Sequence, residues 1–228
     1  MGRLFVLGDI HGAYRALRQC LDRSGFDHDS DHLIFLGDVC DGWPETREAI
    51  DELMRIKHLT CLVGNHDIMA LPWMKRGEML SSWLNQDGVA TMRSYATGVP
   101  ESHIRFLEEA LPYYILDNRC FVHAGFDPDR PISVQDIEVL SWDRNLARRA
   151  LEAYRTGAIG NLTTYREVYM GHTPIPFGRP IMGGGVWMMD TGAGWSGVLS
   201  MMNVETKEVF VSDEVVGLYP GVEGRIKK

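Results

Sequence analysis

The sequence predicts a mixed α/β fold, and two regularities of its apolar residues carry this prediction. In the first third of the chain, short apolar runs alternate with amphipathic segments, a pattern typical of parallel strands joined by helical crossovers. Towards the C-terminus, apolar runs follow one another closely, which is typical of antiparallel hairpins. We therefore expect a parallel sheet first, followed by a second sheet with a mixed ladder.

The first apolar run, residues 4–7, has apolar residues on both alternating faces, which favours a buried parallel strand. It ends in Gly8-Asp9-Ile10-His11-Gly12. Asp9 and His11 are two residues apart, so on an extended backbone their side chains point the same way and could hold one metal ion. Considered alone, the motif is equally compatible with Asp9 capping the next helix and His11 lying on the surface.

The same pattern returns in four later segments. Each is an apolar run that ends in potential metal ligands beside small residues: Leu33 to Asp38, Leu59 to Asp67, Cys120 to Gly125 and Val168 to Thr173. Chance accounts for one or two such endings but not for five. Because open α/β sheets bind ligands at the carboxyl ends of their strands, these residues are candidates for one site.

The segments between these runs are predicted to be mainly helical. Helices are expected over 12–24 and 45–57, and residues 68–111 form a helical insertion rich in Met and Trp. Its Met and Trp residues are expected mainly in the core, with Trp83, Asn85 and Gly88 as candidates for a substrate cleft.

The second half is predicted to contain both strands and helices. We expect two strands within 112–126, helices near 133–140 and 144–154, a Gly- and Pro-rich loop after residue 174, three strands at 186–190, 197–203 and 208–212, and a peripheral tail over 216–228. No domain boundary is evident, so residues 1–228 are expected to form one domain.

The composition excludes several classes of protein. The 228 residues carry a formal net charge of −8, which argues against nucleic-acid binding through bulk electrostatics. No apolar stretch is long enough to span a membrane, and we recognise no signal peptide. The four cysteines form no C-x-x-C pair, which favours buried free thiols over disulfides. We therefore expect a cytoplasmic protein.

The candidate ligands at the strand ends define a chemistry. They offer oxygen and imidazole nitrogen but no thiolate: Asp9, His11, Asp38, Asn65, His123 and His172. Such a set suits manganese, which we expect first, or Fe, Zn, Co and Ni. Six ligands are too many for one catalytic ion with an open position, but they fit two ions if one carboxylate bridges them.

In their order and spacing, these motifs resemble those of the PPP family, the metal-dependent serine/threonine phosphoprotein phosphatases within the calcineurin-like phosphoesterases. The resemblance rests on Gly8-Asp9-Ile10-His11-Gly12, Gly37-Asp38-Val39-Cys40-Asp41, Gly64-Asn65-His66-Asp67, His123-Ala124-Gly125 and Gly171-His172-Thr173-Pro174. Ser141-Trp142-Asp143-Arg144 and Asp190-Thr191-Gly192-Ala193 resemble further stretches of the bacterial and phage members. The fold this implies is two packed mixed β-sheets flanked by helices.

The resemblance also implies a role for each motif residue. Asp9, His11 and Asp38 would hold one metal, and Asp38, Asn65, His123 and His172 the other. His66 would be the general acid, oriented by Asp41. Arg144, together with Asn65 and His66, would bind the phosphate. A hydroxide bridging the metals would attack the phosphate directly, so no phosphoenzyme would form.

The implied function is hydrolysis of phosphate monoesters, first of all phosphoserine and phosphothreonine in proteins. Two departures from the family pattern bear on it. Gly42 stands where the family usually has a phosphate-binding Arg; Arg47 could replace it or lie on a solvated face, and Trp43 could wall the phosphate or pack beneath the insertion. Asp67 stands where eukaryotic members have Glu, which is closer to the bacterial branch. A symmetrical dinucleoside tetraphosphate hydrolase therefore remains an alternative, and a low-turnover metal-binding regulatory domain a remote one.

Overall fold

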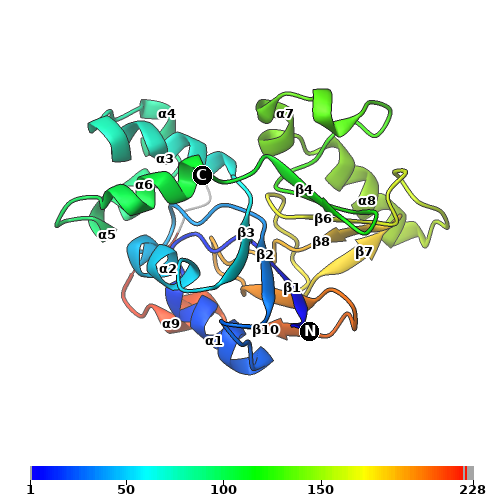
Figure 1. Ribbon diagram of the computed structural model, residues 1–228, viewed down its shortest axis with the longest axis horizontal. Coiled ribbons are helices and arrows are strands. Elements are labelled where there is room, and N and C mark those ends of the chain that lie inside the picture. The colour runs from blue at the N-terminus through cyan, green and yellow to red at the C-terminus, as the bar shows by residue number, and fades with distance from the viewer. Residues whose placement is uncertain (1, 223, 225–228) are drawn as a thin grey trace.

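The computed structural model describes residues 2–222 and 224, and within them the strands form two five-stranded sheets. The first sheet has the order β10-β9-β1-β2-β3 and the second the order β4-β5-β6-β8-β7 (Figure 1). The strand bounds are β1 Leu4–Leu7, β2 His32–Phe35, β3 His58–Cys61, β4 Tyr113–Leu116, β5 Arg119–Val122, β6 Glu167–Met170, β7 Ile181–Gly183, β8 Val186–Met188, β9 Ser200–Asn203 and β10 Val209–Val211.

The first sheet confirms the predicted parallel core and corrects the position of the last hairpin. β1 pairs in parallel with β2, and β2 with β3. β9 pairs antiparallel with β1, placing Asn203 opposite Phe5, and β10 pairs with β9. The β9–β10 hairpin was expected in the second sheet, but it extends the first sheet instead. It satisfies the backbone hydrogen-bonding groups along the edge of β1, which would otherwise be unpaired.

The second sheet is mixed. β5, β6 and β8 run parallel, with β4 and β7 antiparallel at the two edges. β7 was not predicted from the sequence and lies in the segment expected to be a Gly- and Pro-rich loop. This strand has only three residues and pairs only with β8 among the described strands, so its local apolar signal is too short to recognise.

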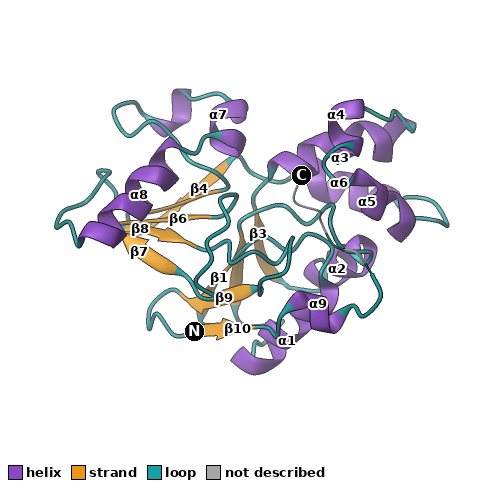
Figure 2. Ribbon diagram, turned by 180° about the vertical axis from the view of Figure 1, so that it is seen from behind, coloured by secondary structure: helices purple, strands orange, loops and turns teal. Residues whose placement is uncertain are grey.

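The two sheets pack face to face, and helices cover their outer surfaces (Figure 2). One buried cluster lies between the sheets and includes Val6, Ile34, Phe121, Tyr169 and Met202. A second cluster joins the first sheet to the helices of the N-terminal half, and a third joins the second sheet to α7 and α8. The predicted fold class, two packed mixed sheets flanked by helices, is confirmed.

The helices differ from the prediction mainly at their ends. Their bounds are α1 Tyr14–Ser24, α2 Thr46–Leu53, α3 Asn65–Arg76, α4 Ser81–Leu84, α5 Gly88–Ser94, α6 Glu101–Glu108, α7 Ile137–Trp142, α8 Asn145–Thr156 and α9 Val215–Leu218, with a short 3-10 helix at Ile132–Val134. The 3-10 helix and α7 replace the helix expected near 133–140. α3 begins at Asn65, so the Asn65-His66-Asp67 segment forms the first helical turn rather than the end of a strand.

The expectation of a peripheral C-terminal tail is wrong for its first residues. α9 leads to Tyr219, which is 2% exposed and stacks on the buried indole of Trp43 with ring centroids 5.0 Å apart. Trp43 donates a hydrogen bond from its Nε1 to the carbonyl of Ala193. Trp43 shares its buried cluster with residues of the insertion, and it is not among the residues that line the cavity at the predicted site. The tail residues 223 and 225–228 lie outside the described residues.

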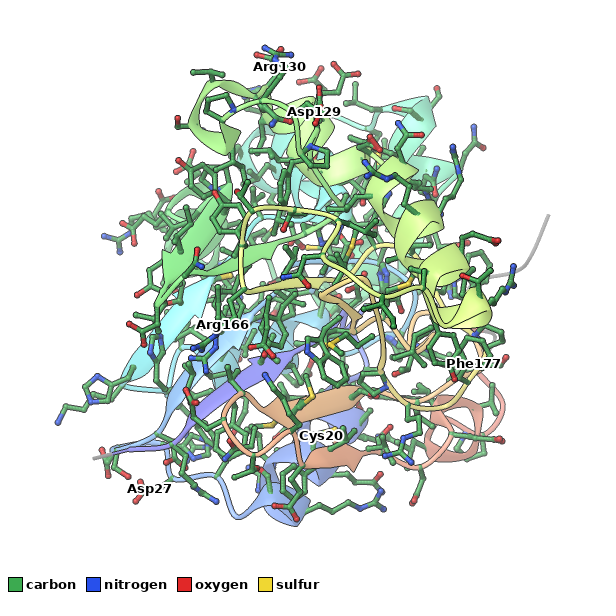
Figure 3. All side chains as sticks on the ribbon, turned by 90° about the vertical axis from the view of Figure 1, so that its right-hand side faces the viewer. Cys20, Asp27, Asp129, Arg130, Arg166 and Phe177 are labelled. Atoms are coloured by element: carbon green, nitrogen blue, oxygen red, sulfur yellow. The ribbon has the colours of Figure 1, made fainter. Side chains whose placement is uncertain are left out.

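The cysteines have the expected state. All four are free thiols, and three are buried. Cys20, labelled in Figure 3, lies on α1, with its thiol 3.3 Å from the carbonyl oxygen of Leu199, the residue before β9. Among the described residues, no helix is both long and apolar enough to cross a membrane.

Replacing Tyr219 with alanine is expected to lower the free energy of unfolding by about 3 kcal/mol, because a buried aromatic ring is removed from a packed contact. Tyr219→Phe keeps the ring and loses only the hydroxyl, which accepts the backbone N–H of Arg15 at 3.1 Å, so about 1 kcal/mol is expected. Urea unfolding followed by circular dichroism would measure both. Equal, near-zero effects would show that the tail is peripheral after all.

Candidate metal centre

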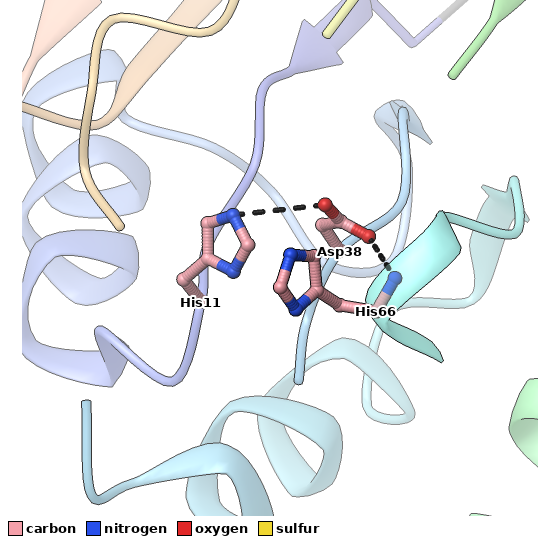
Figure 4. A group of neighbouring side chains, drawn as sticks. All are labelled: His11, Asp38 and His66. Carbon is pink, nitrogen blue, oxygen red and sulfur yellow. Dashed lines mark hydrogen bonds and ion pairs between the residues drawn. The ribbon is translucent and has the colours of Figure 1, made fainter. Parts of the chain in front are cut away.

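The predicted ligands converge from both sheets. Asp9 and Asp38 follow β1 and β2, His123 and His172 follow β5 and β6, and Asn65 begins α3. Two groups of potential ligand atoms, each within 4.8 Å of one another, share Asp38: His11, Asp38 and His66 in one, and Asp38, His123 and His172 in the other. Figure 4 shows the first group.

Asp38 occupies the central position of the site. Its Oδ2 lies 3.6 Å from Nε2 of His11 and 3.4 Å from Nε2 of His123. Nε2 of His123 is also 3.1 Å from Oδ1 of Asn65. A carboxylate facing both groups has the placement that a bridge between two ions requires.

Two of the histidines are oriented by backbone carbonyls. Nδ1 of His11 lies 3.0 Å from the carbonyl oxygen of Cys40, and Nδ1 of His123 lies 2.8 Å from that of Leu36. Since a carbonyl only accepts, each Nδ1 carries a proton and donates it, which leaves Nε2, on the side of Asp38, as the atom that could bind a metal once it is deprotonated. This is the usual arrangement of a metal-ligating histidine.

Asp9 and His172 have buried polar atoms that lack partners among the described residues. Oδ2 of Asp9 accepts the backbone N–H of His172 at 2.9 Å, but Oδ1 of Asp9 and Nε2 of His172 have no hydrogen-bond partner. An unsatisfied buried group costs about 1–3 kcal/mol, and a bound cation would satisfy both. The donor set therefore fits divalent metal ions, although Asp9 lies outside the two ligand groups and its role stays a prediction.

The charges of the site are strongly coupled. Burial raises the pKa of Asp38, but the facing imidazoles of His123, His66 and His11 bring it well below its ordinary value. Burial and the neighbouring Asp190 carboxylate raise the pKa of Asp9. The lowered pKa leaves the Asp38 carboxylate ionised and able to bind a cation.

The pKa values of the two histidines of the second ligand group, His123 and His172, are shifted in opposite directions. Burial lowers the pKa of His123, but Asp38 and Asp9 raise it to about 10. Burial and the charge of His123 lower the pKa of His172 to about 3. In the absence of a metal, a proton on His123 therefore partly compensates the buried carboxylates, while His172 is neutral and ready to ligate.

The backbone is strained at the site. Four predicted site residues have a positive φ: 49° at His11, 60° at Asp38, 69° at Asp41 and 62° at His172. Left-handed conformations of non-glycine residues are unfavourable, and they persist where the surrounding structure imposes them, often at functional sites. The turns after the strands are thus shaped to direct these side chains inwards.

Asp67 holds the loop after β2 against the start of α3. Its buried carboxylate accepts four backbone N–H groups, those of Asp38 at 2.8 Å, Val39 at 3.0 Å, Cys40 at 3.1 Å and Gly64 at 3.0 Å. These donors compensate the buried charge. Asp67 therefore fixes Asp38 relative to the helix that carries Asn65 and His66.

His66 and Asp41 form the predicted acid pair. Nδ1 of His66 lies 2.7 Å from Oδ2 of Asp41, and both side chains are buried. The backbone N–H of His66 donates to Oδ1 of Asp38 at 2.9 Å (Figure 4). Burial raises the pKa of Asp41, and its hydrogen bond with His66 opposes this effect. Because His66 also belongs to the first ligand group, general acid and metal ligand are both open to it.

A cavity of about 100 Å³ opens onto these groups, the space of roughly three water molecules. Six predicted site residues line it: His11, Asp38, Asn65, His66, Arg144 and His172. Five others line it too: Gln86, Trp142, Pro174, Asp190 and Trp195. The predicted residues Asp9, Asp41 and His123 are buried and are not among the lining residues. A phosphoryl group fits this space, whereas the remainder of a substrate must lie outside it.

Six of the lining residues were predicted from the sequence as site residues, and the other five were not. Trp142, Pro174 and Asp190 belong to motifs that resemble the family's but had no predicted role. Gln86 and Trp195 lie outside every predicted motif. None of the insertion residues proposed for a substrate cleft lines the cavity. Trp83 and Gly88 are buried and Asn85 is exposed. Gln86, from the same insertion, lines the cavity instead.

The two arginines considered for phosphate binding differ. Arg144 lines the cavity, and within the described part of the chain no carboxylate forms an ion pair with it. Arg47 instead donates from its guanidinium to Oγ1 of Thr97 at 2.7 Å, and its backbone N–H donates to Ser94. Arg47 does not line the cavity, so it does not replace the arginine missing at Gly42.

Comparisons with known proteins identify this arrangement. The family model described as calcineurin-like phosphoesterase matches residues 2–196. The serine/threonine-protein phosphatase 1 of Salmonella typhimurium is 28% identical over 211 residues, covering 89% of this chain and 92% of that protein. The symmetrical bis(5'-nucleosyl)-tetraphosphatase of Pseudomonas fluorescens is 25% identical over 270 residues, covering 90% and 92%.

Solved structures agree at the level of the fold. One that is provisionally assigned as a diadenosine tetraphosphatase has a TM-score of 0.69 and 21% identity, covering 92% of each chain. The chain belongs to the calcineurin-like phosphoesterase family. It is a metallophosphoesterase, a hydrolase of phosphoesters from a family that uses divalent metal ions.

Asp67→Asn is expected to weaken binding of Mn²⁺ about tenfold or more, because the support of the ligand loop is lost. It is also expected to lower the free energy of unfolding by about 3 kcal/mol, since an amide cannot accept all four N–H groups. Calorimetric titration and urea unfolding would measure the two effects. Asp129→Asn changes an exposed carboxylate on the surface (Figure 3) and should change neither; the same result for Asp67→Asn would contradict its anchoring role.

Metal binding is expected to release protons and to strengthen as the pH rises from about 6 to about 8. The sign follows from His123, whose pKa of about 10 means that it holds a proton over this range, which a metal must displace. The raised pKa of Asp9 acts in the same direction. Calorimetry in two buffers of different ionisation enthalpy would count the protons. Binding without proton release and without pH dependence would contradict this picture.

Proposed function

We propose that the protein hydrolyses phosphate monoesters, with phosphoserine and phosphothreonine side chains of proteins as its substrates. The observation that carries this proposal is the His66–Asp41 pair beside the cavity. An alkoxide is a poor leaving group, so cleavage of a serine or threonine phosphate benefits from a proton donor at the leaving oxygen. A polyphosphate leaving group needs this proton much less.

Each residue of the site would have a defined task. Asp9, His11 and Asp38 would hold one divalent ion, and Asp38 would share the second with the ligand set Asn65, His123 and His172. Bound ions would lower the pKa of water towards about 7 and neutralise charge on the phosphoryl oxygens. Mn²⁺ is our first choice among the metals that fit these ligands.

The remaining residues would bind and protonate the substrate. Arg144 would donate two hydrogen bonds from its planar guanidinium to phosphate oxygens, and Asn65 would help to orient them. His66 would donate its Nε2 proton to the leaving oxygen, while Asp41 holds Nδ1. We further propose a cytoplasmic protein whose catalytic domain spans residues 1–228.

The charge around the site also favours a monoester. Arg144 is the one Lys or Arg side chain among the described residues that line the cavity, and Gly42 offers none. A larger cavity of about 440 Å³ adjoins it, sharing Pro174 and Trp195, and its lining contains Glu214 but no Lys or Arg. Beyond the proposed metal ions, a chain of four phosphates would find few positive side chains in these two spaces.

A symmetrical dinucleoside tetraphosphate hydrolase is the second candidate function. The same adjoining cavity supports it, because its walls are largely apolar and include the indole of Trp195, against which a nucleobase could stack. A relative of this activity also aligns over most of the chain.

Release of inorganic phosphate would test the two functions. Metal-stripped protein, reconstituted with Mn²⁺, would be assayed with a phosphothreonine peptide and with diadenosine tetraphosphate. We expect metal-dependent release from the peptide, reduced about 100-fold or more in kcat by His66→Asn without loss of bound metal. His58→Asn changes an exposed histidine away from the site and should be without effect.

Three other outcomes of this assay would contradict the proposal. Preference for the dinucleotide would replace the protein phosphatase by the nucleotide hydrolase. Loss of one metal in His66→Asn would make His66 a ligand rather than the acid. No release from either substrate with two metals bound would favour the regulatory domain.

A further inference from the structure

Asp41 receives more hydrogen bonds than its pairing with His66 requires. Nε1 of Trp83 donates to both carboxylate oxygens, at 3.0 Å from each, and Oγ1 of Thr91 donates to Oδ1 at 2.7 Å. The backbone N–H of Asp41 in turn donates to Oγ1 of Thr91 at 2.8 Å. Asp41, Trp83 and Thr91 each have 0% exposure.

These donors come from the helical insertion. Trp83 lies on α4 and Thr91 on α5, 42 and 50 residues beyond Asp41 in the chain. Asp41 itself lies in an irregular loop with a φ of 69°. Its side chain therefore depends on partners outside its own segment for its orientation.

The packing around Trp83 fixes the direction of its N–H group. Its indole lies beside that of Trp73, with ring centroids 5.6 Å apart. On another side it lies so close to Gly88 that a Cβ there would be 2.4 Å from the ring. A buried, tightly packed indole has few alternative rotamers, so its N–H remains directed at Asp41.

We propose that Trp83 and Thr91 are positioning residues for proton donation, so that the helical insertion is a working part of the active site. They donate hydrogen bonds to the same carboxylate of Asp41 that pairs with Nδ1 of His66. Asp41 then keeps the imidazole of His66 turned towards the leaving oxygen. Catalytic groups lose efficiency when their geometry loosens by about 1 Å.

The inference rests on the proposed role of His66 as the general acid, and the test separates the two. Phenyl phosphate and 4-nitrophenyl phosphate differ little in size, but phenoxide is the poorer leaving group and depends more on a proton donor. A defect in proton donation therefore lowers kcat for phenyl phosphate more than for 4-nitrophenyl phosphate. A general loss of folded protein or of metal lowers both equally.

The variants are Trp83→Phe, which keeps a ring and removes the N–H, and Thr91→Val, which keeps the volume and removes the hydroxyl. We expect each to lower kcat for phenyl phosphate about tenfold, a fraction of a full general-acid effect, with less than a threefold change for 4-nitrophenyl phosphate. KM and bound Mn²⁺ should stay unchanged. Thr91→Val keeps the test available if Trp83→Phe does not fold.

Trp73→Phe is the matched control. It makes the same chemical change in the neighbouring indole, which has no hydrogen bond to Asp41 among those the structure records, and it should leave the ratio of the two kcat values unchanged. If His66→Asn alters this ratio but Trp83→Phe and Thr91→Val do not, the two residues are merely structural and the inference is wrong. If His66→Asn itself leaves the ratio unchanged, the proposed acid fails instead.

Discussion

The buried carboxylate of Asp67 is the constraint on which the site depends. It accepts four backbone N–H groups, three from the loop after β2 and one from Gly64. A buried charge is tolerated only with such partners, so the loop and the start of α3 must stay together. Their contact is so close that a Cβ at Gly64 would lie 2.0 Å from Oδ1 of Asp38. The central carboxylate and the helix that carries Asn65 and His66 are thereby fixed as one unit.

The site exists only when the two sheets are packed together. The first sheet supplies the ends of β1 and β2, and the second supplies His123 and His172 after β5 and β6. The hydrogen bond from Nδ1 of His123 to the carbonyl of Leu36 crosses from one sheet to the other. The apolar cluster between the sheets thus stabilises the ligand set as well as the fold. Metal binding and folding are linked for this reason.

The two sides of the cavity contribute differently. One side is rigid, because the ligands, Asp41 and the insertion residues behind it are buried and hydrogen-bonded. The other side is more open, and there Trp142, Arg144 and Trp195 face the space that the rest of a substrate would occupy. The buried side carries the predicted metal ligands and the His66–Asp41 pair. The open side is where differences in side chains would act on the choice of substrate.

The sequence alone determined the fold class, the family and the ligand types, because strand periodicity and the residues that end each strand are local properties. It could not place the β9–β10 hairpin, detect β7, or show that Trp43 packs against Tyr219. Nor could it show that Trp83 reaches Asp41, since that contact joins segments 42 residues apart. Such features depend on which segments, far apart in the chain, pack against one another in the folded protein. Only the tertiary structure decides this, because packing and buried hydrogen bonds override local preference.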